Sequence, residues 1–374
     1  MSEILLKLRN LKRRLRVRTR IRELSAIAKN RKKDGAIITL AGNYNYGNII
    51  QRYALLTFLR KNGYNFDAVK TKTTVPDDTN RAIYGEMMRF VDKYIGGYDF
   101  DPVGSLGYRD YIVGSDQVWR DWYSGDWRQF GVYFLDFLGD KKSNRIAYAA
   151  SFGVDNLAEA GIDDQKKALI NPLIKKFDAI SVREKSGVRL VKELSRNKKL
   201  DIKVVLDPTL LLKSDDYSGL IEASEVRTQK TAKVFCYILD IDDEKLTSIE
   251  KISQNYNNEY SILCTDFSKR FQPVETWLKG FRDSEFVVTD SFHGMVFAII
   301  NNKDFVVFAN HNRGVSRMEN LLDTFGIDHD RLFFADDKEK DTLRLRKLDW
   351  AEINKKLDIL RKDSGEWLMK QIKR

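Results

Sequence analysis

The most constraining stretch of this sequence is residues 286–308, in which two apolar runs enclose a polar turn and a short apolar segment. Residues 286–289 and 305–308 have the β-prone composition of buried strands, and the segment between them is typical of a short helix. The order predicts a βαβ unit. Ligands of doubly wound sheets collect outside the carboxyl ends of the strands, where helix N-termini offer unpaired N–H groups to anions. We therefore expect His293, in the turn after the first strand, to lie at such an edge, either as a functional group or as a capping or packing residue.

The net charge of +11 is concentrated at the N-terminus. Residues 1–33 hold 13 Lys or Arg and two acids, whereas the remaining chain has 52 basic and 52 acidic residues. A basic globule for nucleic acid is therefore disfavoured. Leucine and isoleucine recur along one face of residues 1–33, which predicts a basic amphipathic helix that holds the protein on an anionic membrane surface. A solvated tail and an RNA-binding arm are the alternatives.

A chain of 374 residues predicts more than one domain. After the basic helix of 1–33 we expect an N-terminal Rossmann-like domain at 34–212, a charged hinge at 213–230 that opens a C-terminal Rossmann-like domain at 213–345, and a closing helix in 346–374 that packs back on the first domain. Cys236 and Cys264 lie in apolar runs, which favours reduced thiols and a cytoplasmic protein. No apolar run reaches the roughly 18 to 20 residues that span a bilayer, so membrane association would be peripheral.

Polar residues also follow the predicted strands of the first half. Ser115, Asp116 and Gln117 follow a strand at 111–114, Arg183 follows one at 177–180, and a strand at 204–206 leads into Asp-Pro-Thr. Residues 42–48, GNYNYGN, precede a helix predicted at 49–61; their glycine spacing is not that of a dinucleotide site. Asparagine and tyrosine there suit a sugar or a phosphate, and a structural glycine turn is the alternative. The recurrence predicts one cleft lined by strand ends.

Six ordered motifs resemble those of the polysaccharide pyruvyl transferases. They are Asn45-Tyr46-Gly47-Asn48 with Gln51, then GSDQVW, YAASFG, SVREKSG, DPTLL and TDSFHG, over about residues 36–330. The resemblance implies two doubly wound Rossmann-like α/β domains that face a cleft, similar to the B-type glycosyltransferase fold. It also implies transfer of the enolpyruvyl unit of phosphoenolpyruvate, a co-substrate, onto a sugar of a cell-surface glycan or its lipid-linked precursor, with formation of a ketal. No other cofactor is expected.

The resemblance also implies roles for particular residues. His293 matches the family's histidine and would move the protons. A donor with a phosphate and a carboxylate needs cationic contacts, for which Arg183, Arg317 and Arg313 are the candidates, with Ser291 beside them. The acceptor sugar would meet side chains of two loops, namely Asn45, Tyr46, Asn48, Asp116 and Gln117. Many members carry an arginine two residues before the histidine, where this chain has Ser291; another arginine must replace that contact, or the donor differs.

Two other functions remain open at this point. A glycosyltransferase that uses a nucleotide sugar could occupy the same fold, although no glutamate that would bind a ribose can be placed. A non-catalytic glycan-binding protein would bind no donor. No metal site is expected, because His293, His311 and His329 lie 18 residues apart on separate predicted elements.

Overall fold

The computed structural model describes residues 33–40, 45–70, 77–96, 98–99, 107–121, 126–225, 231–264, 271–309, 314–334 and 345–372. The predicted N-terminal helix, the loop residues 42–44 and Arg313 lie outside these ranges. None of the helices within them is both long and apolar enough to cross a bilayer.

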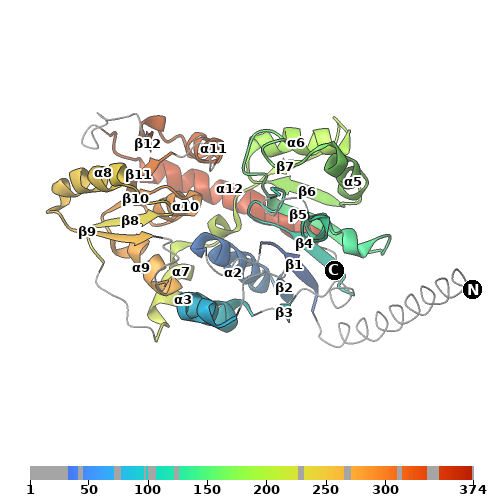
Figure 1. Ribbon diagram of the computed structural model, residues 1–374, viewed down its shortest axis with the longest axis horizontal. Helices are drawn as coiled ribbons and strands as arrows, with labels where there is room; N and C mark the ends of the chain where they lie inside the picture. The colour runs from blue at the N-terminus through green and yellow to red at the C-terminus, as the bar shows by residue number, and fades with distance from the viewer. Residues whose placement is uncertain are drawn as a thin grey trace, which may run out of the picture.

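The first half of the described chain forms a seven-stranded parallel sheet in the order β3-β2-β1-β4-β5-β6-β7 (Figure 1). The strands are β1 (Gly35–Ile38), β2 (Phe66–Lys70), β3 (Tyr98–Asp99), β4 (Asp110–Val113), β5 (Asn144–Ala150), β6 (Ala179–Val182) and β7 (Lys203–Val204). The chain builds outward from β1 to β3 and then returns to the other side of β1 with β4. The switch point of this sheet therefore lies between β1 and β4.

The second half forms a five-stranded parallel sheet in the order β12-β11-β10-β8-β9 within the described residues. Its strands are β8 (Val234–Ile238), β9 (Tyr260–Cys264), β10 (Phe286–Thr289), β11 (Asp304–Phe308) and β12 (Leu332–Phe333). Here the order reverses between β8 and β10. The predicted fold class, two doubly wound Rossmann-like units, is confirmed.

Helices follow most strands and cover both sheets (Figure 1). They are α2 (Tyr46–Lys61), α3 (Asp77–Phe90), α4 (Trp127–Phe130), α5 (Asp164–Ile174), α6 (Lys185–Ser195), α7 (Ser214–Glu222), α8 (Asp243–Ser253), α9 (Val274–Asp283), α10 (Phe292–Ile300), α11 (Ser316–Phe325) and α12 (Trp350–Gln371), with the 3-10 turn η4 (Pro208–Leu211). Helix α2 begins three residues before the predicted start, because the Asn45 side chain caps it by accepting a hydrogen bond from the Asn48 amide at 3.0 Å.

One continuous apolar core joins the two sheets. It includes Ile37 of β1 and Val287 of β10, and Tyr46 lies between them at the start of α2. The Tyr46 ring is fully buried and stacks on Trp277 of α9 with ring centres 5.8 Å apart, and its hydroxyl donates to the Gln272 carbonyl at 2.8 Å. The two halves are thus packed against one another through aromatic side chains.

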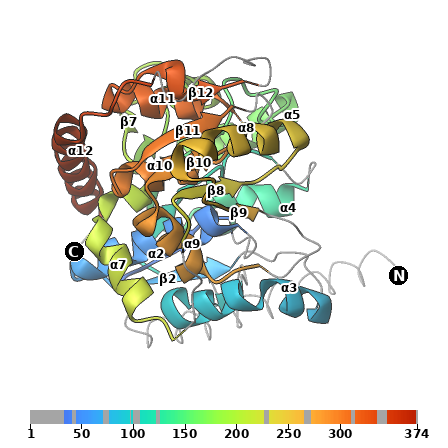
Figure 2. The same ribbon diagram turned by 90° about the vertical axis from the view of Figure 1, so that its left-hand side faces the viewer.

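Helix α12 runs from the second half along one side of the molecule to the first half (Figures 1 and 2). The Leu206 amide donates to the Ser364 hydroxyl at 3.1 Å, and the Asn144 side chain of β5 donates to the Gln371 carbonyl at 2.8 Å. Arg361 donates to the Leu210 carbonyl of η4 at 2.8 Å. These bonds fix the end of α12 beside β5, β7 and η4.

Candidate active site

The centre of the site is a buried ion pair between Arg183 and Asp207. Arg183 follows β6, and its Nη1 donates to Oδ2 of Asp207 at 2.8 Å. The other carboxylate oxygen accepts from the amide and the hydroxyl of Thr209, at 3.0 and 2.7 Å. Burial disfavours the charged form of Asp207, but His293, Arg183 and the Thr209 amide outweigh it and hold the pKa of this carboxyl well below its usual range. Asp207 is therefore a fixed negative charge.

Neutral side chains join the loops at the first switch point. Thr39, after β1, donates its hydroxyl to the Ser115 carbonyl after β4 at 2.9 Å. Gln51 of α2 donates to the Thr39 hydroxyl at 3.2 Å and accepts from the Ser115 hydroxyl at 3.0 Å. The Ser115 hydroxyl lies 3.4 Å from Oδ2 of Asp207. This network ties the ends of β1 and β4 to the ion pair.

His293 enters the site from the second sheet, in the first turn of α10. Its Nε2 lies 3.7 Å from Oδ2 of Asp207, which is an ion-pair distance but too long for a hydrogen bond. Within the described residues Nε2 has no hydrogen-bond partner, although the ring is buried. A side chain at Gly47 of α2 would place its Cβ 2.2 Å from Nδ1 of His293. Gly47 is therefore required for the imidazole to occupy this position.

Two further carboxylates surround Arg183. Nη2 lies 3.8 Å from Asp116, which follows β4, and Nε lies 3.8 Å from Glu184. Burial would lower the pKa of Arg183, yet Asp207, Asp116 and Glu184 together raise it. Asn48 of α2 donates to Asp116 at 3.3 Å. Nε and Nη2 of Arg183 make no hydrogen bond to any described residue, so the guanidinium keeps two donors for another acceptor.

Phe292 packs against the guanidinium groups of two arginines. Its ring lies under the Arg183 guanidinium at 4.2 Å and under that of Arg317, from α11, at 5.7 Å. Burial lowers the pKa of Arg317 to about 10, and repulsion by Arg183 adds to this effect. Two buried guanidinium groups that repel one another beside a single aromatic ring are an arrangement that a bound anion stabilises.

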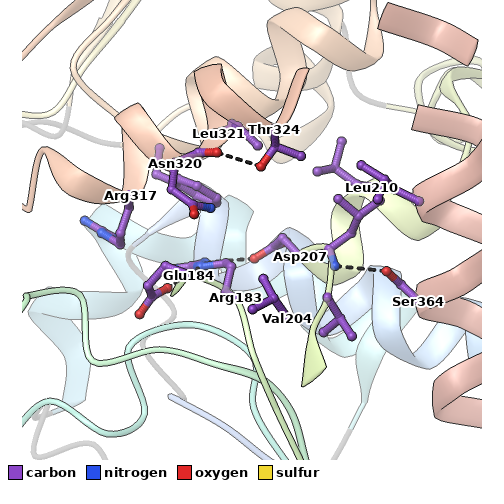
Figure 3. A pocket seen from close by; sticks show the side chains of 14 residues that line it. Arg183, Glu184, Val204, Asp207, Leu210, Arg317, Asn320, Leu321, Thr324 and Ser364 are labelled. Atoms are coloured by element: carbon purple, nitrogen blue, oxygen red, sulfur yellow. Dashed lines mark hydrogen bonds and ion pairs between the residues drawn. The ribbon is translucent and has the colours of Figure 1, made fainter. Parts of the chain in front are cut away.

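A cavity of about 60 Å³ lies between the two halves beside these arginines. Figure 3 shows Arg317 and Glu184 at one end and Leu210 and Ser364 at the other. Asn320, Leu321 and Thr324 of α11 form one wall, and residues 204–206 form the opposite wall. The cavity thus has a charged end and a largely apolar end.

The second switch point is held by a buried carboxylate. Asp290, after β10, accepts hydrogen bonds from the amides of Leu239 and Asp240 after β8, at 2.6 and 3.1 Å. Lys245 of α8 contacts the same carboxylate at 3.0 Å. These bonds fix the turn that immediately precedes His293.

The structure brings five of the ten predicted site residues together. Arg317, His293, Asn48 and Asp116 lie around the pair that Arg183 forms with Asp207. Ser291 is buried at the N-terminus of α10, and its donor contact stays a prediction, as does that of Arg313 outside the described ranges.

Three predicted acceptor contacts have other surroundings. Asn45 caps α2, and Gln117 accepts from Arg120 at 3.3 Å and lies against Gly153. Tyr46 is fully buried between the sheets, where it offers no surface to an acceptor.

Several residues of the site were not singled out from the sequence, namely Asp207, Glu184, Gln51, Gly47 and Phe292. Each lies within one of the six motifs, so the motifs contained the signal. Asp207 was recognised only as the polar end of a strand, because its partners Arg183 and His293 lie 24 and 86 residues away.

The arrangement can bind an anion and move a proton. The guanidinium groups of Arg183 and Arg317 suit a phosphate or carboxylate, and the imidazole of His293 is a group that can accept and donate a proton. No group of three or more His, Cys, Asp or Glu side chains with metal-binding geometry occurs in the described ranges.

Comparison with known proteins places this site in context. The family model described as polysaccharide pyruvyl transferase matches residues 45–312, and no curated protein matched the sequence. Among solved structures, UDP-GlcNAc 2-epimerase from Neisseria meningitidis is similar at 11% identity and a TM-score of 0.50, over 90% of this chain and 99% of that chain. The wall teichoic acid polymerase TagF gives 12% identity and a TM-score of 0.49, over 99% and 97%. At such identities the epimerase likeness shows the fold alone, the two-sheet arrangement of B-type glycosyltransferases.

Proposed function

Because the chain belongs to the polysaccharide pyruvyl transferase family, we propose that it transfers the enolpyruvyl unit of phosphoenolpyruvate to a sugar of a cell-surface glycan or its lipid-linked precursor, with formation of a ketal. The observation that carries the proposal is the meeting of Arg183, Arg317 and His293 from different sheets around the buried Asp207. Those groups supply the anion contacts and the proton carrier that this reaction requires.

The donor site is the charged end of the cavity. Arg183 and Arg317 both line this end and share the donor's negative charge. Arg183 contributes the N–H groups of Nε and Nη2, and its guanidinium lies over the Phe292 ring.

In the proposed reaction two C–O bonds form at the central carbon of the enolpyruvyl unit and its C–O bond to phosphate breaks. The methylene carbon gains one proton and becomes a methyl group, and the two sugar hydroxyls lose one proton each. One of these protons replaces the proton delivered to carbon, and the other leaves with phosphate. His293 carries protons between these atoms, with its Nε2 3.7 Å from Oδ2 of Asp207.

The acceptor approaches from the side of Asp116, which contacts Arg183, and of Asn48, which donates to Asp116; neither residue lines the cavity. Amide and carboxylate side chains there can hydrogen-bond sugar hydroxyls. The donor and acceptor would thus meet across the Arg183–Asp207 pair.

Thermal shift with phosphoenolpyruvate, against a panel of nucleotide sugars, tests the donor. We expect phosphoenolpyruvate alone to raise the melting temperature, and phosphate release to depend on an added glycan acceptor. Stabilisation by a nucleotide sugar instead would establish a glycosyltransferase, and stabilisation by no donor would indicate a glycan-binding protein.

We also propose that the protein works in the cytoplasm at the inner face of the membrane, held by residues 1–33, whose sequence is basic and amphipathic. Deletion of these residues should abolish salt-sensitive binding to vesicles that contain phosphatidylglycerol. If the shortened protein sediments with such vesicles as well as the full chain does, the segment is not the anchor.

A further inference from the structure

Helix α6 carries a row of basic side chains on its solvent face. Lys185, Arg189 and Lys192 are spaced by four and three residues, so they lie above one another along one side of the helix, and Arg196 follows as its C-cap residue. The three helical residues of the row span about 10 Å, at about 1.5 Å per residue. The buried residues of α6, among them Leu190 and Leu194, lie on the opposite side.

This row is a local excess of charge in a body that is neutral as a whole. Residues 185–203 hold seven basic and two acidic residues. No ion pair to a described residue forms at Lys185, Arg189, Lys192 or Arg196; Arg189 contacts only the Asp155 carbonyl. Glu193, which directly follows Lys192, pairs with Lys167 of α5 at 3.6 Å. The exposed side of α12, by contrast, alternates lysines with Asp358, Asp363 and Glu366.

The row begins at the site. Lys185 directly follows Glu184, which lines the cavity, and its amide donates to Asn320 of α11, another lining residue, at 3.4 Å. From that point the basic side chains continue away from the cavity along α6. Exposed Lys198 and Lys199 prolong the basic surface beyond the helix.

We propose that this row binds the anionic part of a polysaccharide whose reacting sugar occupies the cleft. The inference rests on the proposed function, because pyruvyl transfer leaves one carboxylate on every sugar that is modified. A polysaccharide modified at successive sugars becomes a polyanion. The sugars that already carry a pyruvyl group would leave the site and bind to basic side chains next to it. Basic groups one helical turn apart provide these contacts and favour repeated transfer to one chain.

A linear glycan suits this surface better than a bilayer does. The row is one side chain wide and starts at the mouth of the cavity, whereas a membrane needs basic groups spread over a plane. The neighbouring helix α5 also presents acidic groups, for example Asp163 and Asp164, to solvent.

The test is the rate at which lysine amines of the full-length protein are acetylated, measured residue by residue by mass spectrometry. Oligogalacturonate, with a carboxylate on each sugar, should slow acetylation of Lys185 and Lys192 by about threefold or more, and a neutral maltooligosaccharide of equal length should not. Lys355 and Lys362 on α12 are internal controls that should react at unchanged rates. Because each residue is read separately, binding to the basic residues 1–33 does not obscure the result.

A double variant, Arg189→Gln with Arg196→Gln, should remove most of the protection of Lys185 and Lys192 without a change in melting temperature, since both side chains are exposed. Equal protection on α12, or protection by phosphatidylglycerol vesicles but not by oligogalacturonate, overturns the proposal, as does no protection. The thermal shift with phosphoenolpyruvate tests the donor separately. Protection of the lysines without that shift would contradict the proposed reaction but support binding of an anionic glycan to α6.

Discussion

The two sheets close their switch points with different chemistry. In the first sheet the loops after β1 and β4 are joined by the neutral groups of Thr39, Ser115 and Gln51. In the second sheet the loops after β8 and β10 are joined by the buried carboxylate of Asp290, whose charge is met by two amides and Lys245.

The side chains that join the loops are thus different from the charged side chains that can interact with a ligand. The neutral network of the first sheet leaves its charged groups, Asp116, Arg183 and Asp207, to interact with one another and with a ligand. In the second sheet the charge of Asp290 is already neutralised, and His293 is the side chain of this switch point that lies near Asp207. The first sheet therefore supplies a fixed charged frame, and the second supplies the imidazole that we propose as the proton carrier.

Asp207→Asn breaks the frame and has the largest expected effect. The substitution keeps the size of the side chain but leaves Arg183 without its partner at 2.8 Å in a buried site. Removal of one member of a buried pair costs about 3 to 5 kcal/mol of unfolding free energy. Urea denaturation measures the loss. Asp358→Asn on α12 is the control, since the exposed pair with Arg361 contributes about 1 kcal/mol or less.

The same residue predicts an acid limit to stability. Because the pKa of Asp207 is depressed in the folded protein, its contribution is complete above the unfolded pKa of about 3.9 and is lost as the pH falls further towards the folded pKa. The difference in unfolding free energy between wild type and Asp207→Asn should therefore shrink below about pH 4. A difference that stays constant down to about pH 2.5 would contradict a depressed pKa.

His293→Gln tests whether the second sheet supplies the proton carrier. Glutamine keeps similar size and some hydrogen bonding but cannot carry a proton, so turnover should fall by about 100-fold or more. The melting temperature and the shift produced by phosphoenolpyruvate should change little. Near-wild-type turnover would show that this histidine is structural and that the proton carrier lies elsewhere.

Arg317→Lys tests the proposed contact between the Arg317 guanidinium and the donor. Lysine keeps the charge but loses the planar pair of donors, so the Kd for phosphoenolpyruvate should rise about tenfold. Arg183→Lys should instead lose more stability than donor affinity, because its neighbours are carboxylates of the protein. Isothermal titration separates the two, with Arg282→Lys, paired with Asp283 on α9, as the control. Equal affinities in wild type and Arg317→Lys would remove Arg317 from the donor site.

The sequence predicted local units well where burial leaves a clear pattern. The strand expected at 286–289 is β10, because all four residues are buried and a polar turn ends the run. The strand expected at 177–180 is β6 at Ala179–Val182, two residues later, since an apolar run does not fix the register against its neighbour, and the β5–β6 pairing itself shifts between Ala147 and Ala150. Helix α10 begins at Phe292, so His293, which was expected in the turn before the helix, lies within its first turn.

The contacts that make the site were beyond local patterns. Asp207 and His293 lie close together only because the two sheets face one another. Their positions in the sequence do not predict this contact. The need for glycine at position 47 also depends on the other sheet, because a side chain there would collide with His293. Motif resemblance located these positions, and only the fold related them to one another.

Tyr46→Phe has the smallest expected effect. It tests whether Tyr46 only joins the two sheets or also contacts the acceptor. The hydroxyl makes one hydrogen bond, to the Gln272 carbonyl, within a buried aromatic cluster between the sheets. Its loss leaves that carbonyl without the Tyr46 donor and should cost about 1 kcal/mol of unfolding free energy. If Tyr46 only joins the sheets, the KM for the acceptor should not change, whereas Asn48→Ala, which removes the contact with Asp116, should raise it. A raised KM in Tyr46→Phe with unchanged stability would instead mean that the sheets part during turnover and expose this hydroxyl to the sugar.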